Sequence, residues 1–213
     1  MKTANIEVTY VNHCGNDLSV VNAARVSFHK VSSEMTSGDE KLINYLAKHK
    51  HFSPFNHAFL SFRVKAPIFV ARQLVKHKFM PWNEVSRRYV DEEPEFYIPD
   101  VWRKRADNVK QGSSNETLPF HIKEHMERDL ILYQEALNHG VAPEQARMVL
   151  PQNTMSEWIW SGTLGAFCDM LRLRLDPHTQ YESQLVAKKV YDEVVKLFPV
   201  SVGALLDGVV PAT

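Results

Sequence analysis

The sequence predicts a single α+β domain with a small mixed or antiparallel sheet and several long helices. Apolar and polar residues alternate over 6–10, 60–64 and 154–160, and alternation with a period of two is typical of strands with one buried face. Longer stretches repeat apolar residues every three or four positions, which is typical of helices. Because strands and helices do not alternate regularly along the chain, the pattern favours α+β over a parallel α/β sheet.

A few residues set the expected ends of the helices. Asp17 is the predicted N-cap of the first helix, and Pro67 and Pro119 suit the first turns of two others. Gly140 and Pro199 are expected to end helices, because glycine adopts the left-handed backbone of a C-cap and proline cannot continue a helix. The predicted helices cover 17–25, 39–49, 67–75, 119–137, 143–150, 164–171 and 186–197.

Two polar stretches are predicted to lie outside these elements. Residues 30–38 are expected to form a loop, and residues 100–118, rich in Lys, Arg, Ser and Asn, are predicted to form an exposed insertion. The chain has 213 residues, of which 44% are hydrophobic and 23% charged. This is ordinary globular composition, and it fits one domain over 1–213.

Charge balance and cysteine content narrow the class of protein. Lys plus Arg and Asp plus Glu number 25 each, whereas a dedicated nucleic-acid binder usually carries a basic surplus. No apolar run approaches the roughly 20 residues that a membrane span needs, and the N-terminal segment lacks the apolar stretch of a secretion signal. The two cysteines, Cys14 and Cys168, favour a reducing compartment. We expect a cytoplasmic protein without membrane or nucleic-acid partners.

The densest group of charged side chains is the segment 72–88, RQLVKHKFMPWNEVSRR. A single acid, Glu84, stands among six basic residues, together with amide and hydroxyl groups from Gln73, Asn83 and Ser86. This mixture suits a ligand that carries both a phosphate and a polar ring. A solvated basic face, or a nucleic-acid-binding surface, is the alternative interpretation. The basic residues are Arg72, Lys76, His77, Lys78, Arg87 and Arg88.

A second polar group follows the predicted helix 164–171. Arg174 is expected to be partly buried at the end of this helix, and a partly buried arginine needs an anionic partner. The partner is either a ligand or Asp176, in a structural bridge. Arg147, in the segment QARMVLP, has the same two interpretations.

The segment HIKEH at 121–125 matches the H-x-x-E-H pattern of one class of zinc peptidases. Helical spacing would place His121 and His125 on one face. A third ligand would have to come from elsewhere, and Lys123, Glu127 and Arg128 give this helix the composition of a solvated surface. A zinc hydrolase is therefore the weaker hypothesis, and we expect no metal site.

Several common cofactor and catalytic motifs are missing from the sequence. It contains no G-x-G-x-x-G, no G-x-x-x-x-G-K-[ST] and no G-x-S-x-G. A bound dinucleotide would therefore not rest on a Rossmann turn. Cys14 lies at a polar strand end and Cys168 in an apolar helix, and neither has the cationic surroundings that activate a thiolate.

The motif K-H-K-x-x-P-x-N-E-x-S-x-R-Y at 76–89 resembles the signature of flavin-dependent thymidylate synthases, R-H-R-x-x-S-x-N-E-x-S-x-R-Y. The sequence differs from this signature at three positions. The signature has arginine where this chain has Lys76 and Lys78, and serine where this chain has Pro81. Lysine keeps the charge but lacks the two-pronged hydrogen bonding of arginine. Segments in family order extend the resemblance over nearly the whole chain: GNDLSVVNAARVSF, HFSPFNH, APIFVARQ, ARMVLP and LRLRLDPHTQYE.

This resemblance implies a homotetrameric α+β enzyme that holds FAD where subunits meet. Such enzymes methylate dUMP to dTMP, with methylenetetrahydrofolate as the carbon donor. Reduced FAD supplies the hydride, and NADPH reduces the flavin again. A related enzyme that makes another 5-substituted pyrimidine nucleotide, such as a 5-hydroxymethyl product, stays open as the alternative.

The resemblance also implies which residues form the site. Arg174 and Ser86 are the implied catalytic residues. The implied dUMP-binding residues are Gln73, Lys76, Glu84, Ser86, Arg87, Arg88, Arg147 and Arg174. The implied FAD-binding residues are Ser27, His51, Ser53, Lys76, His77, Lys78, Asn83, Glu84, Thr163, Gly165 and Asp169.

Overall fold

A four-stranded antiparallel sheet forms the centre of the molecule in the computed structural model, which describes residues 1–90, 92–107 and 112–209. The strands lie in the order β2 (Glu7–Cys14), β3 (Phe59–Pro67), β8 (Met155–Thr163) and β4 (Trp82–Glu84). The predicted α+β class, with a small antiparallel sheet and several long helices, is confirmed. The three predicted strands are present, and each continues three or four residues past its predicted end.

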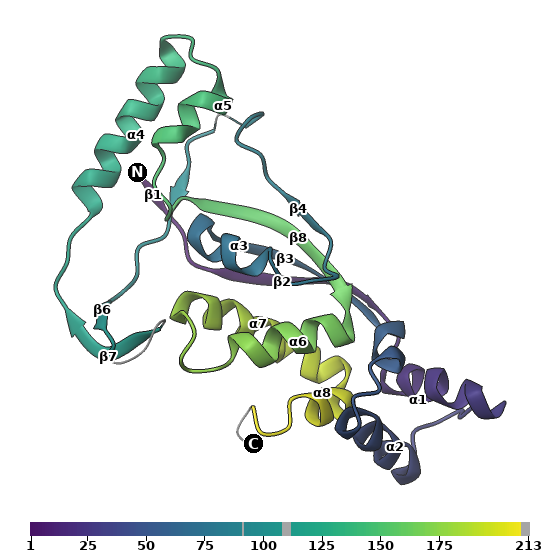
Figure 1. Ribbon diagram of the computed structural model, residues 1–213. Coiled ribbons are helices and arrows are strands. Elements are labelled where there is room, and N and C mark those ends of the chain that lie inside the picture. The colour runs from purple at the N-terminus through teal and green to yellow at the C-terminus, as the bar shows by residue number, and fades with distance from the viewer. Residues whose placement is uncertain (91, 108–111, 210–213) are drawn as a thin grey trace.

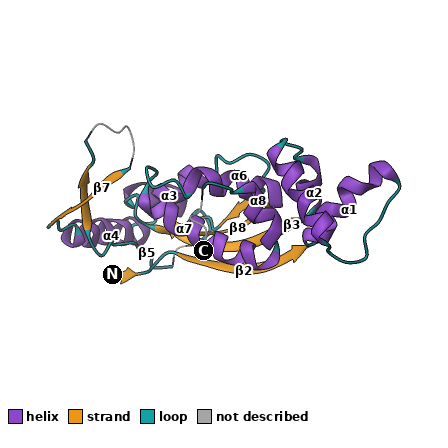
Figure 2. Cartoon of the chain, turned by 90° about the horizontal axis from the view of Figure 1, so that it is seen from below, coloured by secondary structure: helices purple, strands orange, loops and turns teal. Residues whose placement is uncertain are grey.

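Helices cover one face of this sheet (Figure 2). They are α3 (Ile68–Leu74), α6 (Leu164–Arg174), α7 (Tyr181–Leu197) and α8 (Pro199–Leu205). Alternate residues of the strands point toward them, so Phe62 on β3 and Trp160 on β8 are fully buried. Their neighbours point to the other face, where Arg63 pairs with Glu157 at 3.2 Å. The strand alternation in the sequence thus follows from a sheet with one covered face.

The chain between β2 and β3 forms a projecting end of the molecule (Figure 1). It contains α1 (Asp17–Arg25), a 3₁₀ turn (Val26–Phe28), α2 (Ser37–Lys48) and a second 3₁₀ turn (Ser53–His57). The predicted loop 30–38 ends earlier than expected, because Thr36 already caps α2.

The opposite end has a small core of its own (Figure 1). Buried Met126, Leu130 and Tyr133 on α4 (Lys123–Asn138) pack with Phe96 and with Ala146 on α5 (Pro143–Ala146). The strands β1 (Lys2–Thr3) and β5 (Glu95–Phe96) pair in parallel beside this core, and β6 (Trp102–Arg105) and β7 (Ser113–Leu118) form an antiparallel hairpin. Of the segment predicted as an insertion, 100–118, positions 108–111 lie outside the described residues.

Some predicted helix limits are wrong. The N-cap of α1 is Asn16, not Asp17. The Asp17 carboxylate instead accepts hydrogen bonds from the backbone N–H groups of Val200 and Ser201, at 3.0 and 2.9 Å. It thereby caps α8, a helix that the sequence pattern did not predict: Pro199 ends α7 but also begins α8, since proline suits a first helical turn.

Three other differences concern the remaining helices and strands. The helix expected from Pro119 begins at Lys123, because the chain up to Leu118 belongs to β7. The helix α7 begins five residues earlier than predicted, at Tyr181. The short strand β4 was not predicted.

None of the helices in the described part of the chain has the length and apolar character of a bilayer-spanning segment.

Candidate active site

The basic segment 72–88 does not form one continuous surface in the structure. It begins in α3, turns after Leu74, and returns as β4 beside β8. Its residues contribute to three cavities, here named the α6 cavity, the α3 cavity and the β4 cavity. A single solvated basic stripe, as a nucleic-acid-binding surface would need, is therefore not how these side chains are arranged.

The α6 cavity has a volume of about 680 Å³ and lies at the start of helix α6. Lys76 and Lys78 provide cationic groups, and Phe52 and Phe79 provide apolar ones. The described residues that line it are Phe52, Asn56, Lys76, His77, Lys78, Phe79, Thr163, Gly165, Ala166, Asp169 and Leu173. The structure thus brings together six residues implied to bind FAD: Lys76, His77, Lys78, Thr163, Gly165 and Asp169.

Local backbone geometry explains the residue types at the start of α6. The Thr163 hydroxyl accepts a hydrogen bond from the backbone N–H of Ala166 at 3.2 Å, and it donates to Asn56 at 2.8 Å. Gly165 lies so close to Asn56 that a Cβ atom there would be 2.6 Å from its Oδ1. The N–H groups of Leu164 and Ala166 at this helix start are already bonded, to the Ala58 carbonyl oxygen and the Thr163 hydroxyl. The cations and ring surface offered to a ligand therefore come from side chains: Lys76 and Lys78 suit phosphates, and the exposed rings of Phe52 and Phe79 suit the ring of a flavin.

The α3 cavity adjoins the α6 cavity, and Lys76 lines both. Its volume is about 530 Å³. The described residues lining it are Arg72, Gln73, Lys76, Gly112, Arg174 and Gln180. No carboxylate is among these described residues, so the three cations make the cavity suited to a phosphate-bearing ligand.

Arg174 is the last residue of α6. It lines this cavity and contacts His77, the histidine of the signature motif. Its Nε donates a hydrogen bond to Nε2 of His77 at 3.0 Å. Burial, assisted by the positive charge of Arg174, lowers the pKa of His77 to about 4. His77 is therefore a neutral acceptor at ordinary pH. Burial also lowers the pKa of Arg174 itself.

The alternative of a structural bridge between Arg174 and Asp176 is wrong. Asp176 accepts hydrogen bonds from the backbone N–H and the ring of His178, at 2.8 and 3.0 Å. These bonds lower the pKa of the Asp176 carboxyl group. Arg174 is thus held by a neutral imidazole, and its charge is free to act on a ligand.

The β4 cavity has a volume of about 500 Å³ and contains two arginines from distant parts of the chain, Arg87 and Arg147. Glu84 also lines it, and its carboxylate accepts hydrogen bonds from Ser156 Oγ at 2.5 Å and from Trp82 Nε1 at 3.0 Å. The guanidinium of Arg87 donates to the backbone carbonyl of Glu92 at 2.9 Å. Three residues implied to bind dUMP, Glu84, Arg87 and Arg147, therefore gather here.

Six implied site residues do not line any of these three cavities: Ser27, His51, Ser53, Asn83, Ser86 and Arg88. The Ser86 hydroxyl accepts a hydrogen bond from Nε of Arg88 at 3.2 Å. His51 and Ser53 are exposed on the chain that precedes β3. Neither residue lines one of these cavities, although Phe52, which lies between them in the sequence, lines the α6 cavity.

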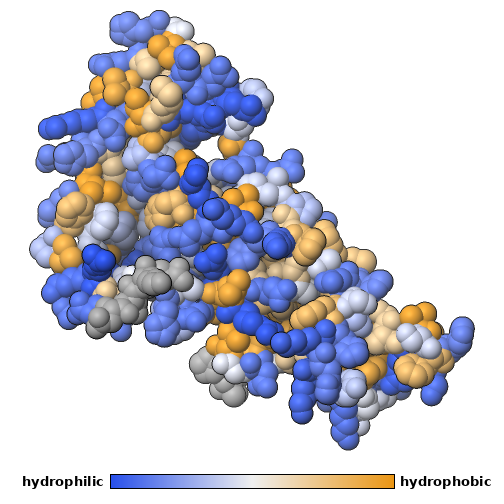
Figure 3. Space-filling view, viewed as in Figure 1, coloured by the Kyte–Doolittle hydropathy of each residue, from blue (hydrophilic) through white to orange (hydrophobic). Residues whose placement is uncertain are grey.

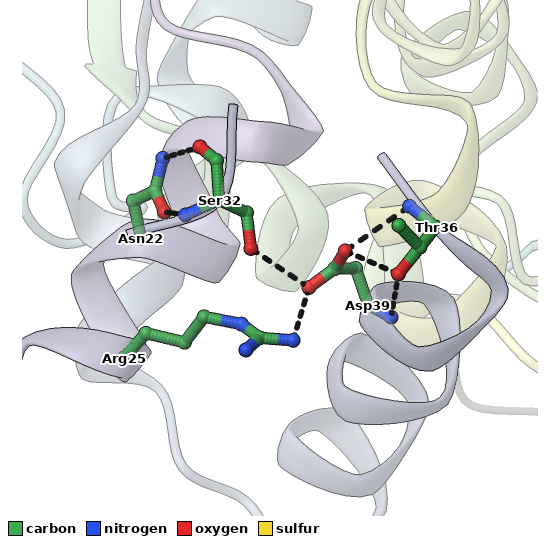
Figure 4. Close-up of polar contacts among 5 residues, drawn as sticks. All are labelled: Asn22, Arg25, Ser32, Thr36 and Asp39. Carbon is green, nitrogen blue, oxygen red and sulfur yellow. Dashed lines mark hydrogen bonds and ion pairs between the residues drawn. The ribbon is translucent and has the colours of Figure 1, made fainter. Parts of the chain in front are cut away.

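Ser27 lies in the 3₁₀ turn after α1, in the projecting end. Arg25 and Ser32, which flank this turn in the sequence, belong to a polar network around Asp39 (Figure 4). The Asp39 carboxylate is 1% exposed and accepts hydrogen bonds from Arg25, Ser32 and Thr36. Asn22 makes two further bonds with the backbone of Ser32, at 3.0 and 2.7 Å. Both ends of the segment that carries Ser27 are thus attached to α1 and α2.

Sequence reasoning missed some residues that line the cavities. Phe52, Asn56 and Phe79 line the α6 cavity. Phe79, an aromatic residue directly after the cationic triplet and 86% exposed, was the one available signal. Gly112, directly before β7, lines the α3 cavity, and nothing in its local sequence indicates this.

The zinc hypothesis loses its geometric basis. His121 precedes α4, which begins at Lys123, so the H-x-x-E-H spacing does not place two histidines on one helical face. Within 1–90, 92–107 and 112–209, no three His, Cys, Asp or Glu side chains are grouped as metal ligands.

The fold and these cavities define an α+β protein whose cationic cavities suit phosphate-bearing ligands, and whose sequence has no glycine-rich phosphate loop. Comparison with protein families specifies the class further. The model of the family "thymidylate synthase complementing protein" matches residues 9–200. The chain is 37% identical over 209 residues to the flavin-dependent thymidylate synthase of Thermus thermophilus, covering 94% of this chain and 77% of that protein. It is 38% identical over 208 residues to that of Kosmotoga olearia, covering 94% and 90%.

Solved structures agree with the family comparison. A UMP/dUMP methylase, PolB from Streptomyces cacaoi, bound with 5-Br dUMP, superposes with a TM-score of 0.86 at 31% identity, over 100% of both chains. The same enzyme bound with 5-Br UMP gives a TM-score of 0.81 at 30% identity, again over 100% of both chains. The chain belongs to the flavin-dependent thymidylate synthase family and is a methyltransferase enzyme of that family.

Proposed function

We propose that this protein catalyses the reductive methylation of dUMP to dTMP. The observation that carries the proposal is the convergence of Gln73, Lys76 and Arg174 in the α3 cavity, directly beside the α6 cavity. Lys76 lines both cavities, so a nucleotide and a flavin would be neighbours. The names of the relatives support the same reaction, since they are flavin-dependent thymidylate synthases and a UMP/dUMP methylase.

Arg174 is the proposed catalytic residue. Transfer of a one-carbon unit requires electron density at carbon 5 of uracil, and a fixed cation stabilises the negative charge that develops on the ring. Arginine stays protonated and cannot act as a general base, so its role is electrostatic. Ser86, on the chain that follows β4, is the second proposed catalytic residue, and its hydroxyl has a hydrogen free to donate besides the bond it accepts from Arg88.

The α6 cavity is the proposed FAD site. Lys76 and Lys78 would hold the phosphates beside the start of α6, while Phe52 and Phe79 offer apolar surface for a ring. When bound, reduced FAD supplies the hydride for methylation, and NADPH reduces it again. Methylenetetrahydrofolate is the proposed carbon donor, with His51 beside the flavin and the folate.

We propose a homotetramer in which the sites are shared between subunits. Among the described residues, the β4 cavity and the α3 cavity have no lining residue in common, although both contain residues implied to bind dUMP. A second copy would bring its Glu84, Arg87 and Arg147 to the α3 cavity of the first. Tyr89 and Met148, next in sequence to these segments, and Phe28, in the projecting end, are large apolar residues at least 74% exposed. The projecting end also shows hydrophobic surface among hydrophilic groups (Figure 3).

The solution mass tests this shared arrangement. The active species should have a mass several-fold above 24.5 kDa. An active monomer would contradict it.

Product analysis tests the proposed reaction. The purified protein is incubated with dUMP, methylenetetrahydrofolate, FAD and NADPH, and the nucleotide product is identified by mass spectrometry. We expect dTMP. A 5-hydroxymethyl nucleotide would favour the alternative product, and an unchanged nucleotide would refute the proposal. UMP is assayed in parallel, because PolB is named a UMP/dUMP methylase and methylation of UMP is the second candidate function.

A further inference from the structure

The β6–β7 hairpin is attached to the start of α7 through Arg103. The guanidinium of Arg103 forms an ion pair with Glu182, and these two side chains are only 18% and 7% exposed. The Arg103 group also lies 4.2 Å from the ring centroid of Tyr181 and donates from Nε to Ser113 Oγ at 2.9 Å. A buried ion pair with further hydrogen bonds fixes the relative position of two elements.

Gly112, the residue directly before β7, makes a second contact with the same region. A Cβ atom at Gly112 would lie 2.6 Å from the backbone carbonyl oxygen of His178, and the φ of Gly112 is +90°. Only glycine suits this close approach. The hairpin therefore forms part of the wall of the α3 cavity, which Gly112 lines.

A continuous series of hydrogen bonds leads from this ion pair to Gln73, a residue of the proposed nucleotide site. The amide Nε2 of Gln180 donates to Oε2 of Glu182 at 3.3 Å. The amide Nε2 of Gln73 donates to Oε1 of Gln180. Ser183 Oγ donates to Oε1 of Gln73 at 3.1 Å. Both glutamine side chains line the α3 cavity.

The carboxylate at the end of this series determines its direction. An ionised carboxylate only accepts hydrogen bonds, whereas a side-chain amide can donate or accept depending on its rotation. Glu182 therefore requires Gln180 to present its amino group, and Gln180 then presents its carbonyl oxygen to Gln73. Gln73 must donate in turn. Without the carboxylate, both side-chain amides could rotate by about 180°, which would exchange the positions of their oxygen and nitrogen atoms.

We infer that Arg103 and Glu182 are positioning residues for the nucleotide: through Gln180 they fix which atoms Gln73 presents to the ligand in the α3 cavity. In this arrangement Gln73 keeps one amide hydrogen for an acceptor oxygen of the nucleotide. Arg103 acts from the hairpin by fixing the Glu182 carboxylate. The inference rests on the proposed function of the α3 cavity as the dUMP site.

Two variants separate positioning from simple docking of the hairpin. Glu182→Gln keeps the shape but removes the acceptor-only group. Arg103→Met/Glu182→Leu replaces the pair with apolar side chains, which often preserves folding stability. For both we expect the KM for dUMP to rise about 3- to 10-fold, the size of one misplaced hydrogen bond. We expect kcat at saturating dUMP to stay within about twofold, because binding rather than the transition state is affected.

The same hairpin supplies a matched control. Lys104 and Glu116 form an exposed ion pair at 2.7 Å, with side chains 51% and 73% exposed. Lys104→Met/Glu116→Leu removes this pair and should leave the KM for dUMP unchanged. Arg103→Lys retains the charge but not the Ser113 and Tyr181 contacts, so its KM should lie between those of the wild type and the apolar variant.

The outcomes distinguish the inference from the function on which it rests. If both Glu182 variants fold and show the wild-type KM for dUMP, the pair only holds the hairpin and the inference is refuted. The same follows if the exposed control pair raises KM equally. If the wild-type protein does not bind dUMP, as measured by calorimetry, the proposed function fails and the inference fails with it.

Discussion

Arg174, at the end of α6, donates from Nε to Nε2 of His77, in the turn after α3, at 3.0 Å. The two residues are 97 positions apart, and each lines a different cavity: Arg174 the α3 cavity and His77 the α6 cavity. The bond thus joins the proposed nucleotide and flavin sites. A neutral acceptor orients the guanidinium and leaves its positive charge in place. A carboxylate partner would neutralise that charge.

Arg174→Ala should lower kcat on the order of 10²-fold, the size of effect seen when one oriented transition-state donor is removed. Arg174→Lys should recover only part of this loss, because an ammonium group cannot reproduce the guanidinium geometry. Steady-state kinetics and the melting temperature are measured on the same preparation.

Arg172 provides the control for this experiment. It lies on the same helix, but its guanidinium binds the backbone carbonyl of Leu205. Arg172→Ala should lower stability and leave the kcat of the folded protein near the wild-type value. If Arg174→Ala behaved in the same way, its role would be structural.

The imidazole of His77 should titrate far below its usual pKa. Burial and Arg174 lower this pKa from 6.5 to about 4. Because the unfolded chain takes up the proton first, the folded state has its full stability above pH 6.5 and loses this contribution as pH falls toward 4. Protonation of His77 in the folded protein would remove the acceptor for Arg174, so kcat should fall only as the pH approaches the folded-state pKa of about 4.

NMR titration measures this pKa, with the His77 signal assigned by its loss in His77→Gln. The acid loss of stability between pH 6.5 and 4 should be smaller in His77→Gln than in the wild type. A His77 pKa close to 6.5 would contradict the half-buried, neutral histidine.

The double variant Cys14→Ser/Cys168→Ala should retain most of the activity. Cys14 is exposed, and Cys168 is 1% exposed in the core, where burial raises the pKa of its thiol. A raised pKa keeps a thiol protonated and unreactive. The melting temperature should fall because Cys168→Ala leaves a small cavity. A folded but inactive double variant would show that a cysteine takes part in the reaction.

Asp39→Asn should destabilise the projecting end that carries Ser27. Hydrogen bonds from Thr36, with a contribution from Arg25, hold the pKa of Asp39 below its usual 3.8. The stabilisation is therefore present above pH 3.8 and is lost as the pH falls further. At pH 7 we expect a melting temperature lower by roughly 5 °C.

The exposed neighbour Glu40, also in the first turn of α2, is the matched control for this substitution. Glu40→Gln should leave the melting temperature almost unchanged. The difference between wild type and Asp39→Asn should shrink well below pH 4. A pH-independent difference would exclude the charge of Asp39 as its cause.

The sequence pattern predicted the strands that have one buried and one exposed face. Apolar and polar residues alternate along β3 and β8 because helices cover one face of the sheet and leave the other exposed. β4 has three residues and forms through pairing with β8, where the ring of Trp82 stacks on that of Trp158 at 4.2 Å. The helix α8 likewise depends on Asp17, more than 180 positions earlier and invisible to a local pattern.

The same distinction applies to the candidate site. The signature 76–89 identified the cationic triplet because those residues are adjacent in sequence. Spacing alone could not predict that Arg174 binds His77, since Asp176 is closer along the chain. The contact of Arg103 with Glu182 was also beyond the sequence, because it depends on how the hairpin folds back over α7.

Release of the hydrogen at carbon 5 of uracil tests the proposed function most directly. The protein is incubated with dUMP labelled with tritium at carbon 5, and tritium in water is counted. We predict release that requires both methylenetetrahydrofolate and a reductant, depends on added or bound flavin, and falls strongly in Arg174→Ala. Absence of tritium release by the folded, flavin-loaded protein with all substrates present would contradict the account.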